Sequence, residues 1–310
     1  MSAESDFIAA IRGLATHPAA RGLLDDAAVL ALDGITLILT HDILAEGVHF
    51  LPCDPPGDVA WKLVAVNLSD LAAKGAAPIG VLLGYSLGDS EWDRAFAEGL
   101  ATALKTFGIP LLGGDTVRAP RVFGLTAIGV ATGIVHSRSG ARPGDHLWVS
   151  GTIGDAGAGL RMLKGGLARD DFLVERYRNP RPRLEAGQAL TSSVSAIMDV
   201  SDGLLIDAAR IAAASGVAVE VDLALVPMSQ ACRRAAGEDR PARLAAATAG
   251  DDYELLFTAA PDRSAAILAL ADEIGLPLNR IGEVGAGEGL RLIDDGESVP
   301  LPPSLGWEHG

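Results

Sequence analysis

The amino-acid sequence predicts an α+β protein of two domains, in which mixed sheets are covered by helices. The chain has 310 residues, more than one hydrophobic core usually organises. Runs typical of strands are interspersed with segments of helical periodicity. A stretch rich in glycine, proline and charge, residues 137–145, separates two differently patterned halves. We therefore expect one domain over residues 1–137 and a second over residues 138–310.

Local patterns predict the elements of the first domain. Residues 5–15 have the spacing of a short amphipathic helix. Two strand-like runs, 27–32 and 35–40, are joined by Asp33-Gly34, the two-residue signal of a type I′ hairpin. A proline-rich break at 55–57 precedes a long helix. The expected helices extend from this break to about residue 75 and over 91–107, and the expected strands cover 79–86, 109–113 and 122–135.

The second domain begins with an expected strand at 146–150 and a glycine-rich segment, 151–159, that opens a helix near residue 154. This segment does not have the GxGxxG spacing, and the chain contains no GxxxxGK[ST] motif. We interpret it first as a tight strand-to-helix turn. The further expected helices cover 184–193, 203–215, 228–236 and 261–274, and the further strands cover 217–222, 253–259, 279–284 and 289–293.

The charge balance excludes several classes of protein. Forty acidic side chains against 25 basic ones give a net charge of −15, whereas nucleic-acid binding needs clustered Lys and Arg. The N-terminus is acidic, and no apolar run reaches the roughly 18 residues of a membrane helix. The two cysteines, Cys53 and Cys232, show neither zinc-ligand nor disulfide spacing. We expect a cytoplasmic protein with no nucleic-acid or membrane partner.

Aspartates recur at the ends of apolar runs and beside small residues. Carboxylates in such places can approach a shared ligand closely, and Mg²⁺ prefers oxygen ligands of this kind while it bridges to phosphates. Each aspartate taken singly is more often a helix cap or a turn residue. Six such places in one chain nevertheless favour a metal-dependent phosphate site. They are Asp25-Asp26, Asp42, Asp115, Asp199, Asp202 and Asp251-Asp252.

Asp70 lies on a polar stripe of an otherwise apolar helix, with Asn67 and Lys74 at i−3 and i+4. One interpretation is a solvated stripe with an Asp70–Lys74 ion pair. The other is an inward stripe that offers a carboxylate to a metal ion. Two further residues allow similar alternatives: His49 is a surface histidine or faces the same cleft as Asp42, and Trp307 pins the C-terminal tail or stacks on a ring.

Seven motifs together resemble the thiamine-monophosphate kinase family, in the ATP-binding superfamily of aminoimidazole ribonucleotide synthetase. The resemblance runs from about residue 5 to the tail Gly306-Trp-Glu-His309, so it covers nearly the whole chain. It implies a two-domain aminoimidazole ribonucleotide synthetase-like fold whose N-terminal domain closes a β-barrel across a homodimer. The motifs are LLDDAA (23–28), THDILAEGVHF (40–50), VNLSDLAAKGA (66–76), GGDT (113–116), SRSG (137–140), DVSDGL (199–204) and GDDYEL (250–255).

The resemblance also implies an activity, phosphorylation of thiamine monophosphate by ATP to thiamine diphosphate with several Mg²⁺ ions. No catalytic base is expected, because a substrate phosphate is already largely ionised at neutral pH and positioning supplies most of the rate. The implied metal ligands are Asp26, Thr40, His41, Asp42, Asp70, Asp115, Asp199 and Asp202. The implied nucleotide contacts are Gly114, Asp115, Arg138 and Ser201, and the implied thiamine-side contacts are His49, Asp251 and Trp307.

Three positions depart from the family pattern. Leu24 replaces a glycine and cannot adopt positive φ as cheaply. His41 replaces a hydroxyl residue, so a metal contact there is kept only if it is made through the backbone carbonyl. Asp251 replaces a longer glutamate.

Two alternatives stay open. One is another ATP-using member of the superfamily, such as aminoimidazole ribonucleotide synthetase, although the Tyr253 block and the Trp307 tail fit it poorly. The other is a non-catalytic acidic protein that binds divalent metal, which leaves Arg138, Ser201 and the terminal aromatic unexplained.

Overall fold

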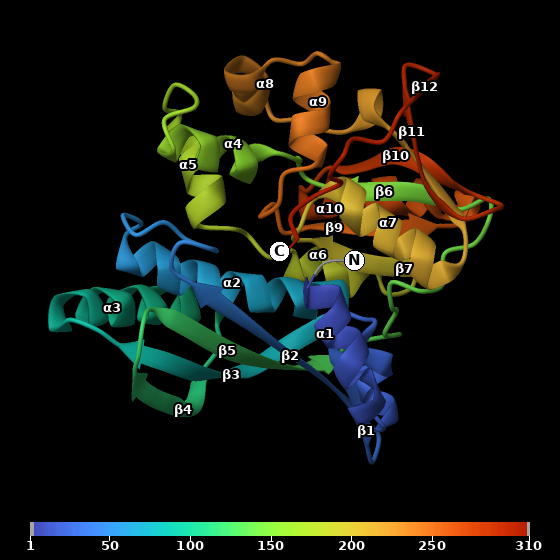
Figure 1. Ribbon diagram of the computed structural model, residues 1–310. Coiled ribbons are helices and arrows are strands. Elements are labelled where there is room, and N and C mark those ends of the chain that lie inside the picture. Colours follow the sequence, from blue (N-terminus) through green and yellow to red (C-terminus); the bar gives the residue numbers. More distant parts are fainter. Residues whose placement is uncertain (1–2, 309–310) are drawn as a thin grey trace.

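The computed structural model describes residues 3–308, so His309 of the tail motif lies outside the described chain. Two sheets dominate it, one built from residues 28–131 and the other from residues 146–299. Figure 1 shows the first sheet below the second, with helix α2 (Pro56–Ala73) between them. The expected α+β architecture with mixed sheets and helices is confirmed. The boundary placed at residue 137 falls in the connection between the two sheets.

The N-terminal sheet has the strand order β1-β2-β5-β3-β4. The predicted hairpin is confirmed: Asp33 and Gly34 both have positive φ, 40° and 89°, as a type I′ turn requires. Neighbouring strands are antiparallel except β3 and β4, which are parallel. The strands are β1 (Ala28–Leu32), β2 (Ile35–Ala45), β3 (Ala76–Leu87), β4 (Leu111–Arg118) and β5 (Val122–Ala131).

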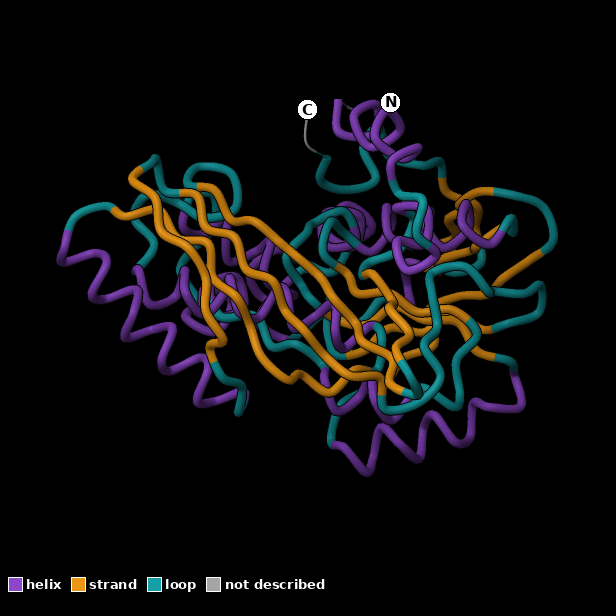
Figure 2. Tube along the Cα trace, turned by 90° about the horizontal axis from the view of Figure 1, so that it is seen from below, coloured by secondary structure: helices purple, strands orange, loops and turns teal. Residues whose placement is uncertain are grey.

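One face of this sheet is covered and the other is open. Helix α2 packs on β2, β3 and β5, and α3 (Ser90–Phe107) packs on α2. Most apolar side chains of α2 are buried, and those of Leu63 and Leu71 are fully so. From below, the strands lie in front of the helices (Figure 2). Within residues 3–308, no helix covers this face, and large apolar side chains stand exposed on it or at its edges, including Ile43, Leu82, Leu111, Leu112, Val117 and Val122.

The C-terminal sheet has the order β12-β11-β8-β10-β6-β9-β7. Helix α7 (Leu204–Ser215) packs on β7, β8 and β11, whereas α10 (Ser264–Ile274) packs on β10 and on α6 (Leu184–Leu190), so the sheet is covered on both faces. Its strands are β6 (His146–Ser150), β7 (Ala196–Val200), β8 (Ala218–Asp222), β9 (Glu254–Ala259), β10 (Leu278–Gly285), β11 (Gly289–Asp294) and β12 (Glu297–Val299).

The remaining helices surround this sheet or join the two halves. Most expected elements are present within a few residues of their predicted bounds, whereas β7, β12, α5 and α9 were not expected. Among residues 3–308, no helix is both long and apolar enough to cross a membrane. The helices are α1 (Ala3–Ile11), α4 (Asp155–Leu163), α5 (Asp171–Arg178), α6 (Leu184–Leu190), α7 (Leu204–Ser215), α8 (Gln230–Ala236), α9 (Arg240–Ala247) and α10 (Ser264–Ile274).

Candidate functional site

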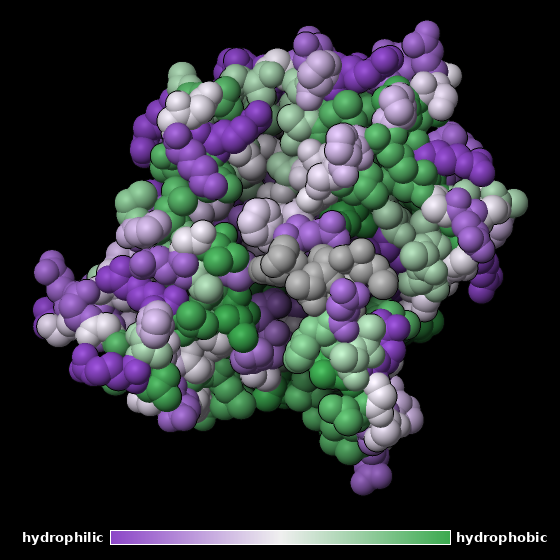
Figure 3. Space-filling model, in the orientation of Figure 1, coloured by the Kyte–Doolittle hydropathy of each residue, from purple (hydrophilic) through white to green (hydrophobic). Residues whose placement is uncertain are grey.

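A cavity of about 610 Å³ lies where the two halves of the chain meet. Strand β2 and helix α2 supply one wall, and the end of β7, helix α4, the segment between α9 and β9 and the C-terminal tail supply the rest. In the surface view, a hollow with hydrophilic side chains lies between the two halves (Figure 3). Eight of the residues singled out from the sequence line this cavity: Asp42, His49, Asp70, Asp199, Ser201, Asp202, Asp251 and Trp307.

Strand β2 and helix α2 bring carboxylates to the cavity from the N-terminal half. The two-residue period of β2 turns Thr40 and Asp42 toward α2. The Thr40 hydroxyl donates a hydrogen bond to the Asp70 carboxylate, and the backbone N–H of Asp42 donates to Oδ1 of Asn67 at 3.0 Å. The polar stripe of α2 therefore points inward, and Asp70 has no ion pair with Lys74.

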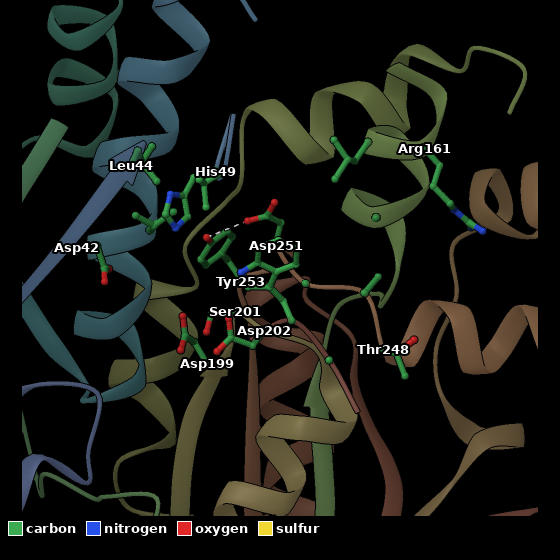
Figure 4. A pocket seen from close by; sticks show the side chains of 18 of the residues that line it. Asp42, Leu44, His49, Arg161, Asp199, Ser201, Asp202, Thr248, Asp251 and Tyr253 are labelled. Atoms are coloured by element: carbon green, nitrogen blue, oxygen red, sulfur yellow. Dashed lines mark hydrogen bonds between the residues drawn. The ribbon is translucent and has the colours of Figure 1, made fainter. Parts of the chain in front are cut away.

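Strand β7 brings a third carboxylate from the C-terminal half. Asp199 is 3% exposed, and its Oδ2 accepts a hydrogen bond from the Ser69 hydroxyl of α2 at 2.6 Å. Beyond the strand end, Ser201 and Asp202 also face the cavity (Figure 4). Asp202 is neutralised by Arg210, whose Nη1 lies 2.6 Å from its Oδ2. Helix α2 and strand β7 thus bring Ser69 and Asp199 into hydrogen-bond contact, although the two residues are 130 positions apart in the sequence.

The carboxylates of this cavity repel one another. Burial first, and then the charges of Asp202 and Asp26, raise the pKa of Asp42 to about 6. Burial and the charges of Asp42 and Asp199 raise the pKa of Asp70 well above its ordinary value. The pKa of Asp199 is raised in the same way, by burial and then by the charge of Asp26. The site is therefore a negative region that an added cation would stabilise.

A strained loop carries Asp251 into the cavity. Both Asp251 and Tyr253 have positive φ, 71° and 51°, which is costly for residues other than glycine. The loop is held by backbone hydrogen bonds from Asp251 N–H to Ser201 O and from Tyr253 N–H to Val200 O, both at 2.8 Å. The Tyr253 hydroxyl donates to Asp251 Oδ1 at 3.1 Å (Figure 4), and the Lys62 ammonium donates to Oδ2 at 2.9 Å. Both carboxylate oxygens of Asp251 are thus oriented.

His49 and Trp307 reach the same cavity from opposite ends of the chain. The Nδ1 atom of His49 accepts a hydrogen bond from the backbone N–H of Ala45 at 3.0 Å, which places the proton of the neutral ring on Nε2. The backbone N–H of Trp307 donates to Asp202 O at 2.9 Å, so the tail is fixed to the end of β7. Trp307 is 51% exposed and lines the cavity.

Asp26 lies beside this set but is already paired with cations. Its Oδ1 contacts a guanidinium nitrogen of Arg138, and its Oδ2 lies 2.5 Å from the Lys74 ammonium. The contact with Lys74 is an ion pair rather than an aligned hydrogen bond, since Asp26 Oδ2 accepts no hydrogen bond from the described chain. Burial acts to raise the pKa of Asp26, but Lys74 and Arg138 outweigh it, so that the pKa is lowered.

Three predicted residues lie away from the cavity. The His41 side chain faces the open side of the sheet, where its Nδ1 lies 2.8 Å from the Thr126 hydroxyl. Gly114 and Asp115 are exposed on the edge strand β4. Because three inter-strand steps separate β4 from β2, the two strands lie about 14 Å apart. The geometry of one chain therefore does not bring Asp115 to Asp42.

The donor set suits a hard cation but is not a closed metal site. Within residues 3–308, no group of three or more His, Cys, Asp or Glu side chains is arranged to hold a metal ion by itself. Mg²⁺ commonly binds through one or two carboxylates and completes its shell with waters and phosphate oxygens. Asp42, Asp70 and Asp199, which contact no Lys or Arg within the described residues, fit that use.

Sequence reasoning missed several basic residues in or beside the cavity. Lys62, which contacts Asp251 of the cavity wall, is a single cation within the apolar run 59–66, a pattern that could have identified it. Arg161, on α4, and Lys164, the residue that follows this helix, also line the cavity, shortly after the glycine-rich segment. The first interpretation of that segment as a tight turn holds, because Gly154 has φ 86° and a Cβ at Gly157 would lie 2.3 Å from Ala249 Cβ. Gly157 also forms part of the cavity wall.

Both halves of the chain are similar to known proteins of one family. The family profile described as "AIR synthase related protein, N-terminal domain" matches residues 24–135, and the corresponding C-terminal profile matches residues 142–295. A thiamine-monophosphate kinase of Caulobacter vibrioides is 43% identical over 304 residues, which are 94% of this chain and 86% of the relative.

Two solved structures are similar over almost their whole length. The thiamine-monophosphate kinase of Stenotrophomonas maltophilia K279a is 40% identical with a TM-score of 0.78, covering 95% of this chain and 96% of the other. A structure described as AaThiL complexed with AMPPCP and TMP is 30% identical with a TM-score of 0.83, covering 97% and 95%.

Proposed function

This chain belongs to the thiamine-monophosphate kinase family, and from that premise we infer that it uses ATP to phosphorylate thiamine monophosphate, giving thiamine diphosphate. The observation that carries the inference is the meeting of His49, Asp251 and Trp307 with the carboxylates Asp42, Asp70 and Asp199 around one cavity. A relative described with AMPPCP, an ATP analogue, and TMP supports the same pair of substrates.

The reaction is a direct in-line phosphoryl transfer. A phosphate oxygen of thiamine monophosphate attacks the γ-phosphorus of ATP, and the bond from that phosphorus to the β-phosphate oxygen breaks to release ADP. The attacking oxygen is already ionised, so the chain needs no general base. The residues around the cavity act by orienting the two anions relative to one another.

Mg²⁺ is the proposed metal, with Asp42, Asp70 and Asp199 as its protein ligands. When bound, it would screen the repulsion between the two substrates and stabilise the charge that develops on the transferred group. Asp202 completes the set at the cavity and is shared with Arg210. Thr40 already donates its hydroxyl to Asp70, and the side chain of His41 points away, so a contact from His41 is proposed only through its backbone carbonyl.

Arg138 and Ser201 are the proposed nucleotide contacts on this chain. The Nε–H of Arg138 is buried and has no hydrogen-bond partner among the described residues, although another nitrogen of the same guanidinium contacts Asp26. Ser201 lies in the cavity wall between Asp199 and Asp202. His49, Asp251 and Trp307 are the proposed contacts to thiamine monophosphate. The proposed location is the cytoplasm.

A homodimer would account for the placement of Gly114 and Asp115. Strand β4 is the exposed edge of a sheet whose open face carries the exposed apolar side chains Ile43, Leu82 and Val122. A second copy packed on this face would cover that surface. It could also bring its own β4 beside the cavity of the first copy. We therefore propose that Gly114 and Asp115 act on the nucleotide of the partner subunit.

Mixing two inactive variants tests this arrangement. Asp42→Asn and Asp115→Asn subunits, refolded together, would form mixed dimers in which one of the two sites is free of both substitutions. Random pairing then predicts recovery of about a quarter of wild-type activity. Absence of recovery, with two differently tagged variants shown to co-purify as mixed dimers, would place both residues in sites made by a single chain.

The activity itself is tested by product analysis. Purified chain, ATP and Mg²⁺ are incubated with thiamine monophosphate, with unphosphorylated thiamine or without acceptor, and ADP and thiamine diphosphate are separated chromatographically. We expect equal amounts of both products only with thiamine monophosphate. Formation of ADP without thiamine diphosphate would overturn the assignment of the acceptor.

A further inference from the structure

Lys74 is a fully buried cation at the end of helix α2. Its side chain is 0% exposed, and its ammonium lies 2.6 Å from Asp25 Oδ1 and 2.5 Å from Asp26 Oδ2. The same nitrogen also approaches the Ile197 carbonyl oxygen of β7 at 3.5 Å. One ammonium therefore joins the loop before β1, the end of α2 and a strand of the second sheet.

Two arginines complete the charge balance around this pair of aspartates. Arg21 contacts Asp25, and Arg138 contacts Asp26. Two carboxylates thus face three cations. By contrast, none of Asp42, Asp70 and Asp199 contacts a Lys or Arg side chain within residues 3–308, and their polar partners there are neutral groups such as the hydroxyls of Thr40 and Ser69.

These five aspartates consequently fall into two groups of different charge. The Asp25–Asp26 group is neutralised by side chains that the fold supplies, whereas the Asp42, Asp70 and Asp199 group is not. The resemblance to the family implies that Asp26 is a metal ligand. In this chain, Lys74 Nζ lies within ion-pair distance of Asp26 Oδ2, where a Mg²⁺ ion would have to approach to about 2.1 Å.

We propose that the Lys74 ammonium is a built-in cation that takes the place of a metal ion at Asp25 and Asp26, so that divalent metal binds to Asp42, Asp70 and Asp199 and not to Asp26. The inference rests on the proposed function in that it assigns the cations of the same site. A tethered ammonium cannot dissociate, and it therefore holds the 24–26 loop against α2 at any metal concentration.

Counting bound Mn²⁺ by electron paramagnetic resonance on the full chain without nucleotide tests the proposal. Mn²⁺ is the probe because it accepts the same oxygen ligands and its free form is directly measurable. Asp26→Asn should bind as many Mn²⁺ ions as the wild type, and Asp70→Asn should bind at least one fewer. Lys74→Met, a neutral side chain of similar length, should bind one more. Lys105→Met, an exposed change on α3, is the matched control and should leave the count unchanged.

Each result decides one part of the proposal. Loss of one Mn²⁺ in Asp26→Asn would make Asp26 a ligand and overturn the proposal, as would a wild type that binds none. An unchanged count in a folded Lys74→Met variant would overturn the role of Lys74. If Lys74→Met does not fold, the comparison of Asp26→Asn with Asp70→Asn still decides which carboxylates bind metal.

The metal counts do not depend on the identity of the acceptor. A wild-type chain that shows the expected counts but forms no thiamine diphosphate would contradict the proposed function and leave this inference standing. A chain that forms thiamine diphosphate but loses Mn²⁺ on Asp26→Asn would do the reverse.

Discussion

The ammonium of Lys62 lies 2.9 Å from Oδ2 of Asp251, although 189 residues separate the two along the chain. Lys62 is 2% exposed and also donates to the His49 carbonyl oxygen at 3.0 Å. Its ammonium lies 4.2 Å from the centroid of the Tyr177 ring. One buried side chain of α2 therefore positions two of the three proposed thiamine-side contacts, His49 and Asp251.

Replacing Lys62 by methionine should weaken substrate binding more than turnover. Hydrogen bonds to charged groups contribute about 1.5–3 kcal/mol, so we expect KM for thiamine monophosphate to rise about tenfold or more, with a smaller change in kcat. Steady-state kinetics measure both parameters. Lys105→Met, which changes an exposed lysine, is the control.

A double-mutant cycle separates this pairing from general damage. If Lys62 acts through Asp251, the effects of Lys62→Met and Asp251→Asn on KM should not add, because either change removes the same contact. Additive effects would show that the two residues act independently.

Asp70→Asn should abolish turnover without destabilising the fold. Loss of a metal ligand removes several kcal/mol of transition-state stabilisation, so kcat should fall at least about a hundredfold. Since burial and neighbouring carboxylates raise the pKa of Asp70, a neutral amide relieves repulsion in the metal-free chain. The thermal midpoint measured in EDTA should therefore stay equal or rise.

An exposed aspartate provides the control for this prediction. Asp272→Asn on α10 removes the same charge from the surface and should change neither kcat nor the thermal midpoint. Near-normal kcat in Asp70→Asn would contradict the metal assignment, and a large fall in its thermal midpoint would contradict the account of repulsion.

The two cysteines should differ sharply in reactivity. Cys53 is exposed, whereas Cys232 is buried on α8, and burial together with the charges of Asp155 and Asp252 raises its pKa to about 12. Because the thiolate is the reactive form, Cys232 should stay unreactive up to about pH 9. A thiol reagent at pH 8 should label one thiol per folded chain and two after denaturation. Cys53→Ser should abolish native labelling, and persistent labelling in that variant would contradict the burial of Cys232.

Local sequence patterns were sufficient to predict elements whose conformation is set by neighbouring residues. Asp33-Gly34 predicted the type I′ turn because few other residue pairs accept two positive φ angles. Strand β7 was missed because all five of its residues are buried and Asp199 interrupts its apolar run, so it lacks the alternation of a half-exposed strand. No element was expected over α5, a short segment in which charged residues are interspersed with apolar ones, although its Arg176 is buried against Glu254.

The residue types in the sequence predicted which residues form the site, but not which of them contact one another. Eight of the candidate residues meet around one cavity, whereas His41 faces the other side of β2 because successive side chains of a strand alternate. The pairing of Lys74 with Asp25 and Asp26, rather than with Asp70, depends on how the loop before β1 packs against α2. Contacts between distant segments, such as Lys62 with Asp251, carry no local signal in the sequence.

Gly306, in the C-terminal tail, has no room for a side chain. A Cβ at this position would lie 2.4 Å from Ile206 Cγ2 and 2.5 Å from Asp202 O, closer than real contacts allow. Gly306→Ala should therefore displace the tail and with it Trp307, whose backbone N–H donates to the same Asp202 O. We expect KM for thiamine monophosphate to rise about tenfold, as for Trp307→Ala, while the thermal midpoint changes little. Gly285→Ala, where an added Cβ meets no atom within 4 Å, is the control. Unchanged kinetics in Gly306→Ala would remove the tail from the substrate site.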